Sequence, residues 1–233
     1  LAHWQTPPLV DTEPWPVVSK EADRATFRQR GRFVNYSGTP LDVELERTVR
    51  LLSRDDVAKQ LGGAIPAGVR LVAYASENTL VNAGPAPWTR ETGALSLWIL
   101  GMFQPSAQTT IVVPYRTGAV DSLGPVVNDA YFGKVPADRL VDRDGLLFFS
   151  GDGRHRSKIG VSPRRVRPVL GSYDAARDVL TLVTFDRPEG ASEYVLETAG
   201  LGVTDADMVL TFRNYHNFGP EGRAALNQAV YDA

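Results

Sequence analysis

The chain has no cysteine among its 233 residues, and it has only three histidines. The absence of cysteine excludes disulfide bonds, thiolate catalysis and cysteine-based zinc or iron–sulfur sites. The histidines, His3, His155 and His216, do not show a metal-binding spacing such as H-x-x-x-H. Asp-Gly turns at residues 144–145 and 152–153 offer carboxylates to calcium, but Asp-Gly is also ordinary turn chemistry. We therefore expect neither a metal nor a cofactor.

A strong net charge and long apolar runs are also missing. The 25 Lys and Arg residues against 27 Asp and Glu residues leave a formal charge of −2, so no global field attracts nucleic acid or an anionic membrane. No apolar run reaches the roughly 18 residues of a membrane span. Residues 1–10 lack the basic and apolar regions of a signal peptide. Because the chain starts at Leu1 and not at Met, we expect either a removed leader or a fragment.

The chain does have the composition of a globular protein with a sizeable core, with 43% hydrophobic and 22% charged residues. β-Sandwiches of this length are commonly single domains, so we predict one domain over residues 1–233. Residues 1–20 are rich in Pro and Trp and predict an extended lead-in, with Trp4 and Trp15 packed on the core.

The stretch that begins at Asn82 organises the rest of the chain. It contains two runs rich in β-branched and aromatic residues with Gly and Pro at their ends, which favours two buried strands over a helix. These runs are residues 94–103 and 109–115. Trp98 and Phe103 belong to the first run and are predicted to be core residues. Trp88 lies in the polar turn before it and is predicted to line a cleft.

Alternating or apolar runs bounded by turn residues predict further strands. They cover residues 25–36, 41–52, 69–76, 146–150, 166–172, 179–185, 193–198 and 208–215. For residues 41–52 a helix is the competing interpretation. Helices are predicted at 222–233 and at 54–61, where Ser53 is the cap and Gly62-Gly63 ends the helix. Long strands with helices only at the margins predict an all-β fold, an antiparallel β-sandwich with few short helices, with a barrel as the alternative.

Four blocks of the sequence resemble an uncharacterised bacterial family. They are Trp88-x3-Thr92-Gly93-x-Leu95-Ser96-x-Trp98-Ile99-Leu100-Gly101-Met102-Phe103, Tyr131-Phe132-Gly133-Lys134, Asp152-Gly153-x3-Ser157-Lys158-Ile159-Gly160 and Gly171-Ser172-Tyr173-Asp174. The resemblance extends roughly between Phe33 and Tyr194, and beyond it the tail departs from the Asn-rich and Gly-rich continuation of the family. That family looks like a relative of the galactose-mutarotase-like supersandwich group and often occurs among proteins of polysaccharide use.

This resemblance implies a supersandwich, complete or incomplete, and a sugar or oligosaccharide, neutral or acidic, as the partner. It also implies a periplasmic or secreted location. In mutarotases a Glu near the C-terminal strands is the base and a His is the acid, and that part of the chain is the part that departs from the family. Lys134, Asp152 and Tyr173 lie in the matching blocks and join the predicted sugar-binding residues.

A polar and aromatic cluster precedes the first central strand. The indole of Trp88 matches the C–H face of a pyranose, while Arg90 and Glu91 suit its hydroxyls. Three polar residues are expected to arrive at the same end of the sheet, namely Glu77, Asn78 and Asn82. These residues predict a sugar platform, and the competing interpretation is a core Trp beside an exposed ion pair.

The segment after the Asp152-Gly153 turn is strongly basic. Arg154, Arg156 and Lys158 are predicted to bind a carboxylate or sulfate on an acidic sugar, since guanidinium groups match such oxyanions. Three further arginines extend the patch, namely Arg164, Arg165 and Arg167. The competing interpretation is a solvated hairpin. No aromatic residue is interleaved within the run, which argues against single-stranded nucleic acid as a partner.

Three hypotheses about function follow. A carbohydrate-processing enzyme, epimerase-like or lyase-like, needs an acid and a base on either side of a sugar ring. The candidate catalytic residues are Glu77 or Glu91 with His216 or His155. A non-catalytic carbohydrate-binding module needs only the aromatic platform and a polar rim, and a structural sandwich partner needs neither. The sequence therefore predicts a carbohydrate-binding or carbohydrate-processing domain and leaves enzymatic activity open.

Overall fold

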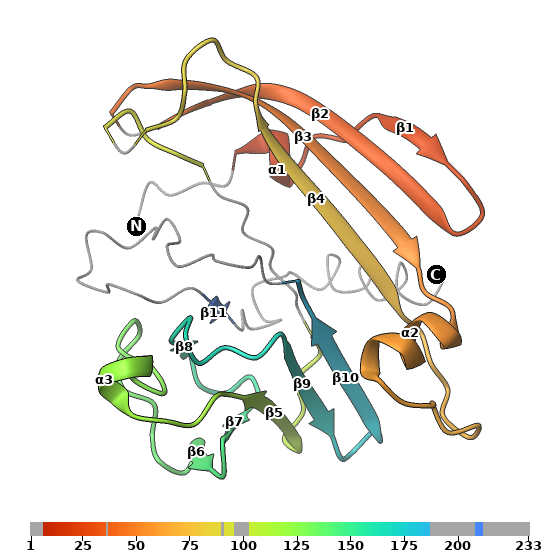
Figure 1. Cartoon of the computed structure of the whole chain (residues 1–233), viewed down its shortest axis with the longest axis vertical. Coiled ribbons are helices and arrows are strands. Elements are labelled where there is room, and N and C mark those ends of the chain that lie inside the picture. Colours follow the sequence, from red (N-terminus) through yellow and green to blue (C-terminus); the bar gives the residue numbers. More distant parts are fainter. Residues whose placement is uncertain (1–6, 36, 90, 96–102, 187–207, 212–233) are drawn as a thin grey trace. The chain divides into compact units, whose positions relative to one another are not determined.

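The computed structural model describes residues 7–35, 37–89, 91–95, 103–186 and 208–211, and of the last four only the backbone. The chain divides into two compact units, Leu1–Trp98 and Ile99–Ala233. Each unit contains an antiparallel sheet (Figure 1). Because two compact units can belong to one domain, the single domain stays a prediction.

The first unit has a four-stranded sheet in the order β1-β2-β3-β4. Its elements are α1 (Pro8–Asp11), β1 (Val17–Lys20), β2 (Arg24–Val34), β3 (Pro40–Leu51), α2 (Arg54–Leu61) and β4 (Tyr74–Asn82). The prediction of an extended lead-in over residues 1–20 is wrong in part, because this segment contains the short helix α1 and the edge strand β1. Residues 41–52 form a strand and not a helix. The strand predicted at 69–76 begins at Tyr74 and continues to Asn82.

The helix predicted at residues 54–61 is confirmed, because α2 has the same bounds. Ser53 accepts a hydrogen bond from the Asp56 N–H, and the Asp56 carboxylate accepts one from the Ser53 N–H, so both ends of a capping box are present. Gly62 ends the helix with φ of 70°, a left-handed conformation that glycine adopts without a Cβ penalty.

The two faces of the first sheet differ because side chains alternate along a strand. One face is apolar, and Leu41, Val43 and Leu45 of β3 are buried on it. The side chain of Leu9 from α1 reaches this face at Gly31, where an added Cβ would lie 2.8 Å from it. Gly31 therefore allows α1 to pack closely on β2.

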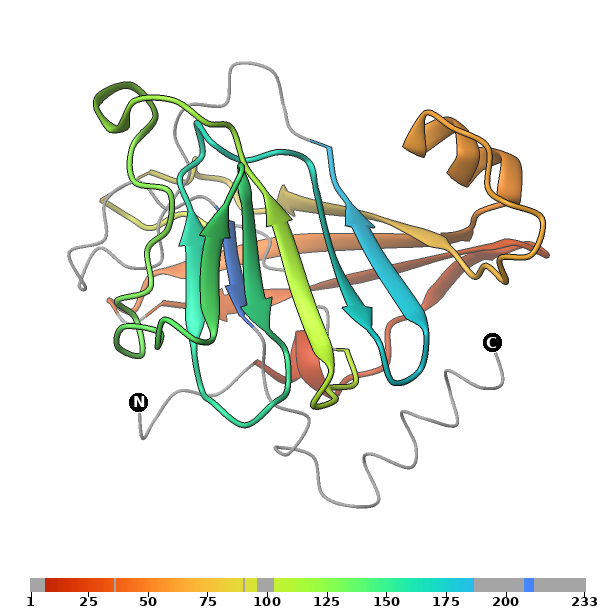
Figure 2. The same cartoon turned by 90° about the horizontal axis from the view of Figure 1, so that it is seen from below.

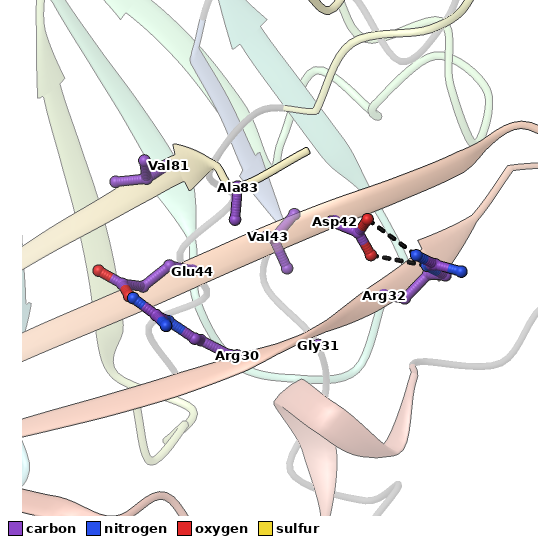
Figure 3. Close-up of a pocket in the computed structure, with 8 residues that line it drawn as sticks. All are labelled: Arg30, Gly31, Arg32, Asp42, Val43, Glu44, Val81 and Ala83. Atoms are coloured by element: carbon purple, nitrogen blue, oxygen red, sulfur yellow. Dashed lines mark hydrogen bonds and ion pairs between the residues drawn. The ribbon is translucent and has the colours of Figure 1, made fainter. Parts of the chain in front are cut away.

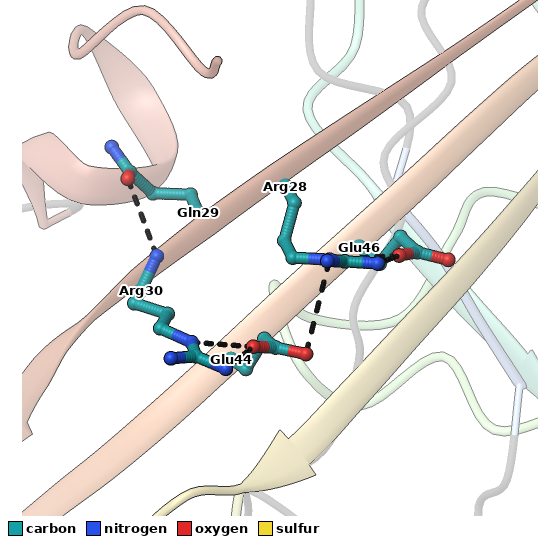
Figure 4. Close-up of polar contacts among 5 residues, drawn as sticks. All are labelled: Arg28, Gln29, Arg30, Glu44 and Glu46. Carbon is teal, nitrogen blue, oxygen red and sulfur yellow. Dashed lines mark hydrogen bonds and ion pairs between the residues drawn. The ribbon is translucent and has the colours of Figure 1, made fainter. Parts of the chain in front are cut away.

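The other face carries a ladder of opposite charges between β2 and β3. The register places each arginine directly opposite a carboxylate: Arg28 opposite Glu46, Arg30 opposite Glu44 and Arg32 opposite Asp42. Figure 4 shows the Arg28 and Arg30 pairs side by side, and Arg28 Nε donates to Glu46 at 2.9 Å. Cross-strand opposite charges stabilise the pairing and fix its register.

The second unit has a five-stranded sheet in the order β10-β9-β5-β7-β6 and a two-stranded pair, β8 and β11 (Figure 2). Its elements are β5 (Thr109–Pro114), α3 (Val120–Leu123), β6 (Leu140–Arg143), β7 (Leu146–Ser150), β8 (Lys158–Val161), β9 (Val169–Asp174), β10 (Val179–Thr184) and β11 (Met208–Thr211). The predicted strands at 109–115, 146–150 and 179–185 are confirmed within a residue or two. Asp144 and Gly145 have φ of 53° and 77°, the conformation of a two-residue hairpin turn.

The core of the second unit lies on one face of this sheet. It is formed by residues of β5, β7, β8 and β9 with their connections, namely Ile111, Val113, Tyr115, Val135, Leu147, Phe149, Ile159, Val161, Val166 and Leu170. The prediction that Phe103 is a core residue is wrong, because its side chain is 44% exposed. Its apolar run ends in a Pro-containing connection, and the described part of that run forms no strand. Trp98 lies outside the described residues.

The described part of the chain is therefore mostly β, with two antiparallel sheets of four and five strands and few short helices, as predicted. In the part of the chain that the structure describes, no helix has the length and apolar character needed to cross a membrane. The predicted elements at residues 193–198 and 222–233 and most of the run 94–103 lie outside the described residues.

Candidate functional site

The loop between Asn128 and Val135 is held in place by hydrogen bonds at both ends. Asn128 and Gly160 of β8 exchange two backbone hydrogen bonds of 2.8 Å each. The Asn128 side chain accepts from the Ala130 N–H at 3.1 Å, and the Asp129 carboxylate accepts from the Val135 N–H at 2.9 Å. These bonds fix the turn that carries Tyr131 and Phe132 next to β8.

Two aromatic rings on this loop contact two cations from the basic segment. The rings of Tyr131 and Phe132 pack edge to face with centroids 4.6 Å apart. The Arg156 guanidinium lies 4.3 Å from the Phe132 centroid, and the Lys158 ammonium lies 4.0 Å from the Tyr131 centroid. We call these four residues the aromatic–cation cluster. Both rings are partly open to solvent, with exposed fractions of 41% for Tyr131 and 37% for Phe132.

The aromatic–cation cluster joins two of the sequence blocks that carry the family resemblance. Aromatic residues are absent within the basic segment, but the fold supplies them from 24 and 27 residues earlier in the chain. The signal available in the sequence was the adjacent pair Tyr131-Phe132 before Gly133. Nothing in the sequence indicated that this pair would contact Arg156 and Lys158.

A nearly buried ion pair supports the start of the basic segment. The guanidinium of Arg139 donates to both carboxylate oxygens of Asp152, and the same carboxylate accepts from the Arg154 N–H at 2.9 Å. The hydrogen bond from Arg139 lowers the pKa of Asp152 from its usual value, although burial opposes this shift. Both carboxylate oxygens of Asp152 have partners within the chain, and its predicted role in contacting a sugar stays a prediction.

We expect Asp152→Asn to destabilise the protein at neutral pH, with a loss that disappears in acid. The folded-state pKa of Asp152 is lowered, so its contribution is fully present above the unfolded-state value of about 3.9 and is lost as the pH falls through the folded value. Denaturant unfolding at a series of pH values checks this. A difference between wild type and variant that stays constant through the acid range would contradict it.

The three arginines after the basic segment donate to backbone carbonyls, and Arg165 is buried, so it does not belong to an anion patch. Arg164 donates to the Ser122 carbonyl at 3.1 Å, and Arg167 donates to the Tyr115 carbonyl at 3.3 Å. Arg165 is 1% exposed, and its guanidinium donates to three backbone carbonyls, those of Arg116, Gly118 and Gly124. These side chains hold the connection after β5. In the basic segment 154–158, Arg154 and His155 are exposed.

The predicted residues of the first unit do not all meet. Glu77 lies in the middle of β4, opposite Thr48, and is exposed. Asn78 points to the other face of the sheet. Asn82 lies at the end of β4, where its side chain donates to the Ala86 carbonyl at 2.8 Å and accepts from the Gly84 N–H at 3.0 Å. The expectation that these three residues gather at one sheet end is therefore wrong.

The remaining predicted site residues belong to both units. Trp88 is half-buried and Glu91 is exposed, whereas Arg90 and His216 lie outside the described residues. Lys134 is exposed and follows the aromatic pair in sequence. Tyr173 is exposed on β9, and its hydroxyl donates to Asp178 at 2.9 Å, which raises its pKa. Among the described residues, no three His, Asp or Glu side chains gather in a way that could hold a metal ion.

A shallow groove of about 660 Å³ lies on the charged face of the first sheet (Figure 3). It is lined by Arg30, Gly31, Arg32, Asp42, Val43, Glu44, Val81 and Ala83. Arg32 donates to both oxygens of Asp42 at 2.6 and 2.9 Å, and Arg30 pairs with Glu44. A polar ligand would have to compete with these pairs, so the groove is a weaker candidate site than the aromatic–cation cluster.

Comparison with known proteins gives a family but no activity. Residues 1–207 match the model of a family described as a family of unknown function, DUF6786. No curated protein and no solved structure matches the chain. The prediction of an uncharacterised family is confirmed, and the relationship to the mutarotase-like group stays a prediction. Since the match covers more than half of the 233 residues, the chain belongs to the DUF6786 family of unknown function.

Proposed function

We propose that this chain is a carbohydrate-binding domain that recognises an acidic sugar at the aromatic–cation cluster. The observation that carries the proposal is the pair of half-open rings, Tyr131 and Phe132, each with a cation within 4.3 Å of its centroid. Aromatic surface suits the apolar C–H groups of a pyranose, and a cation beside it suits a carboxylate or sulfate. The resemblance to proteins of polysaccharide use supports the same ligand class.

The geometry of the loop also favours recognition. The hydrogen bonds of Asn128 and Asp129 hold the aromatic turn before any ligand binds, and the Asp152–Arg139 pair does the same for the basic segment. A ligand that meets rigid groups loses less free energy in ordering them.

The described residues favour a domain that binds a sugar without catalysing a reaction. An epimerase or lyase needs an acid and a base close to the bound ring. His155 is exposed on the basic segment and is the catalytic candidate nearest to the cluster in sequence. The second candidate function, a carbohydrate-processing enzyme, therefore relies on the resemblance.

We expect a uronic acid oligosaccharide to bind more tightly than its neutral parent, and this preference to weaken with added salt because the cations are partly exposed. Lys158→Ala should reduce the affinity for the acidic sugar about tenfold, which corresponds to the loss of about 1.4 kcal/mol. Tyr131→Ala should reduce the affinity for both sugars. Isothermal titration calorimetry with matched acidic and neutral oligosaccharides measures these effects.

Arg154→Ala is the matched control, because it removes one positive charge from the same segment at a side chain outside the aromatic–cation cluster. It should change the affinity by less than about threefold. Equal losses at Arg154 and Lys158 would show a general charge effect and contradict the site. Equal affinity of the wild type for acidic and neutral sugars would contradict the acidic ligand, and absence of binding to either would contradict the proposed function.

A further inference from the structure

Among the described strands, β10 is an edge strand that lacks the usual protective features. It lies at one end of the five-stranded sheet, and β9 is its neighbour among the described strands (Figure 2). Its six residues, VLTLVT, contain no charge and no proline, and its register with β9 runs without interruption from Val179 to Thr184. Edge strands that stay unpaired usually carry charges, bulges or proline, because an open row of N–H and C=O groups is a template for another strand.

The other edges of the two sheets have such protection. β6 is only four residues long and contains Asp142 and Arg143. β1 ends in Lys20, and its register with β2 is irregular between Val17 and Ser19. β4 carries Glu77 in its middle. Of these edge strands, β10 is therefore the one that has neither a charged residue nor an irregular register.

The hydrogen bonds of β9 show which groups of β10 point outward. Phe185, directly after β10, donates its N–H to the Pro168 carbonyl at 3.2 Å and continues the register of the pair. Because hydrogen-bonding direction alternates along an antiparallel strand, the odd-numbered residues of β10 bond to β9. The N–H and C=O groups of Leu180, Leu182 and Thr184 then point away from β9.

These outward groups are complementary to themselves under a two-fold axis. In an antiparallel pair of β10 strands, hydrogen bonds form when even-numbered residues face even-numbered residues. That register also places side chains of the same face next to each other. Leu180 and Leu182, which are 63% and 43% exposed, would then meet the same residues of the other copy, and no like charges of the strand oppose the contact.

We infer that a second copy of this chain binds to the β10 edge and extends the five-stranded sheet across a two-fold axis. The interface consists of the outward backbone groups of β10 and the apolar side chains of Leu180 and Leu182. It is separate from the aromatic–cation cluster and does not depend on the proposed function.

Sedimentation velocity over a range of protein concentrations tests this with two variants. Leu182→Lys places a charge on the β10 edge and should weaken the dimer more than tenfold, about the effect of one unfavourable buried charge. Val141→Lys adds the same charge to an exposed position of the opposite edge strand β6 and should leave the dimer unchanged. Circular dichroism of both variants verifies that they fold.

Amide hydrogen exchange gives a second readout on the unmodified protein. The amides of Leu180, Leu182 and Thr184 should become protected as the protein concentration rises, while those of Thr181 and Val183 should be protected throughout. A protein that stays monomeric at all concentrations overturns the inference. This holds whether the three amides exchange fast or are protected by hydrogen bonds within the same chain. A dimer that Val141→Lys breaks and Leu182→Lys does not break overturns it as well.

Discussion

Replacing Arg165 by methionine is expected to lower the free energy of unfolding by about 3–5 kcal/mol, since each hydrogen bond from a charged group contributes about 1.5–3 kcal/mol and water that reaches the released carbonyls recovers some of this. Arg165 is 1% exposed. It donates to the carbonyls of Gly124, Arg116 and Gly118 at 2.8, 2.9 and 3.0 Å. Methionine fills a similar volume but donates no hydrogen bond, so the three carbonyls lose their donor together.

Arg164→Met is the matched control for this variant. Arg164 is the preceding residue, is exposed, and makes one hydrogen bond to the Ser122 carbonyl, so its loss should cost at most about 1 kcal/mol. Urea unfolding followed by tryptophan fluorescence measures both changes. Similar losses at the two positions would show that the three carbonyl contacts of Arg165 contribute little to stability.

Phe149→Ala is expected to destabilise the protein by about 3–5 kcal/mol, the cost of truncating a buried aromatic residue and leaving a cavity. Phe149 is 2% exposed and lies in β7, opposite Ile111 of β5 and Leu140 of β6. All three residues belong to or pack on the core of the second unit. The surrounding strands are fixed by their ladders, so they have little freedom to close the cavity.

Phe103→Ala provides the comparison, because the sequence alone predicts the same loss at this position. Its side chain is 44% exposed, so we expect a loss of about 1 kcal/mol or less. Thermal unfolding by differential scanning calorimetry distinguishes the two variants. A loss at Phe103 as large as that at Phe149 would place Phe103 in the core and restore the expectation from the sequence.

The sequence by itself determined the elements whose causes are local. Ser53 and Asp56 with Gly62 fixed both ends of α2, because a capping box and a left-handed glycine act within a few residues. Asp144 and Gly145 fixed the turn between β6 and β7 in the same way. The alternation of Leu41, Val43 and Leu45 predicted a strand with one buried face. The all-β fold follows from many such local patterns.

Only the tertiary structure decided which distant residues meet. Tyr131 and Phe132 contact Arg156 and Lys158 because Asn128, outside the strands, forms an isolated backbone bridge with Gly160 of β8, and no local pattern encodes that pairing. Arg165 is an arginine like those of the basic segment, yet it is buried and donates to backbone carbonyls of the connection after β5. The sequence does not show whether a charged side chain contacts solvent, an aromatic ring or a backbone carbonyl. Its role is set by the segments that the fold places beside it.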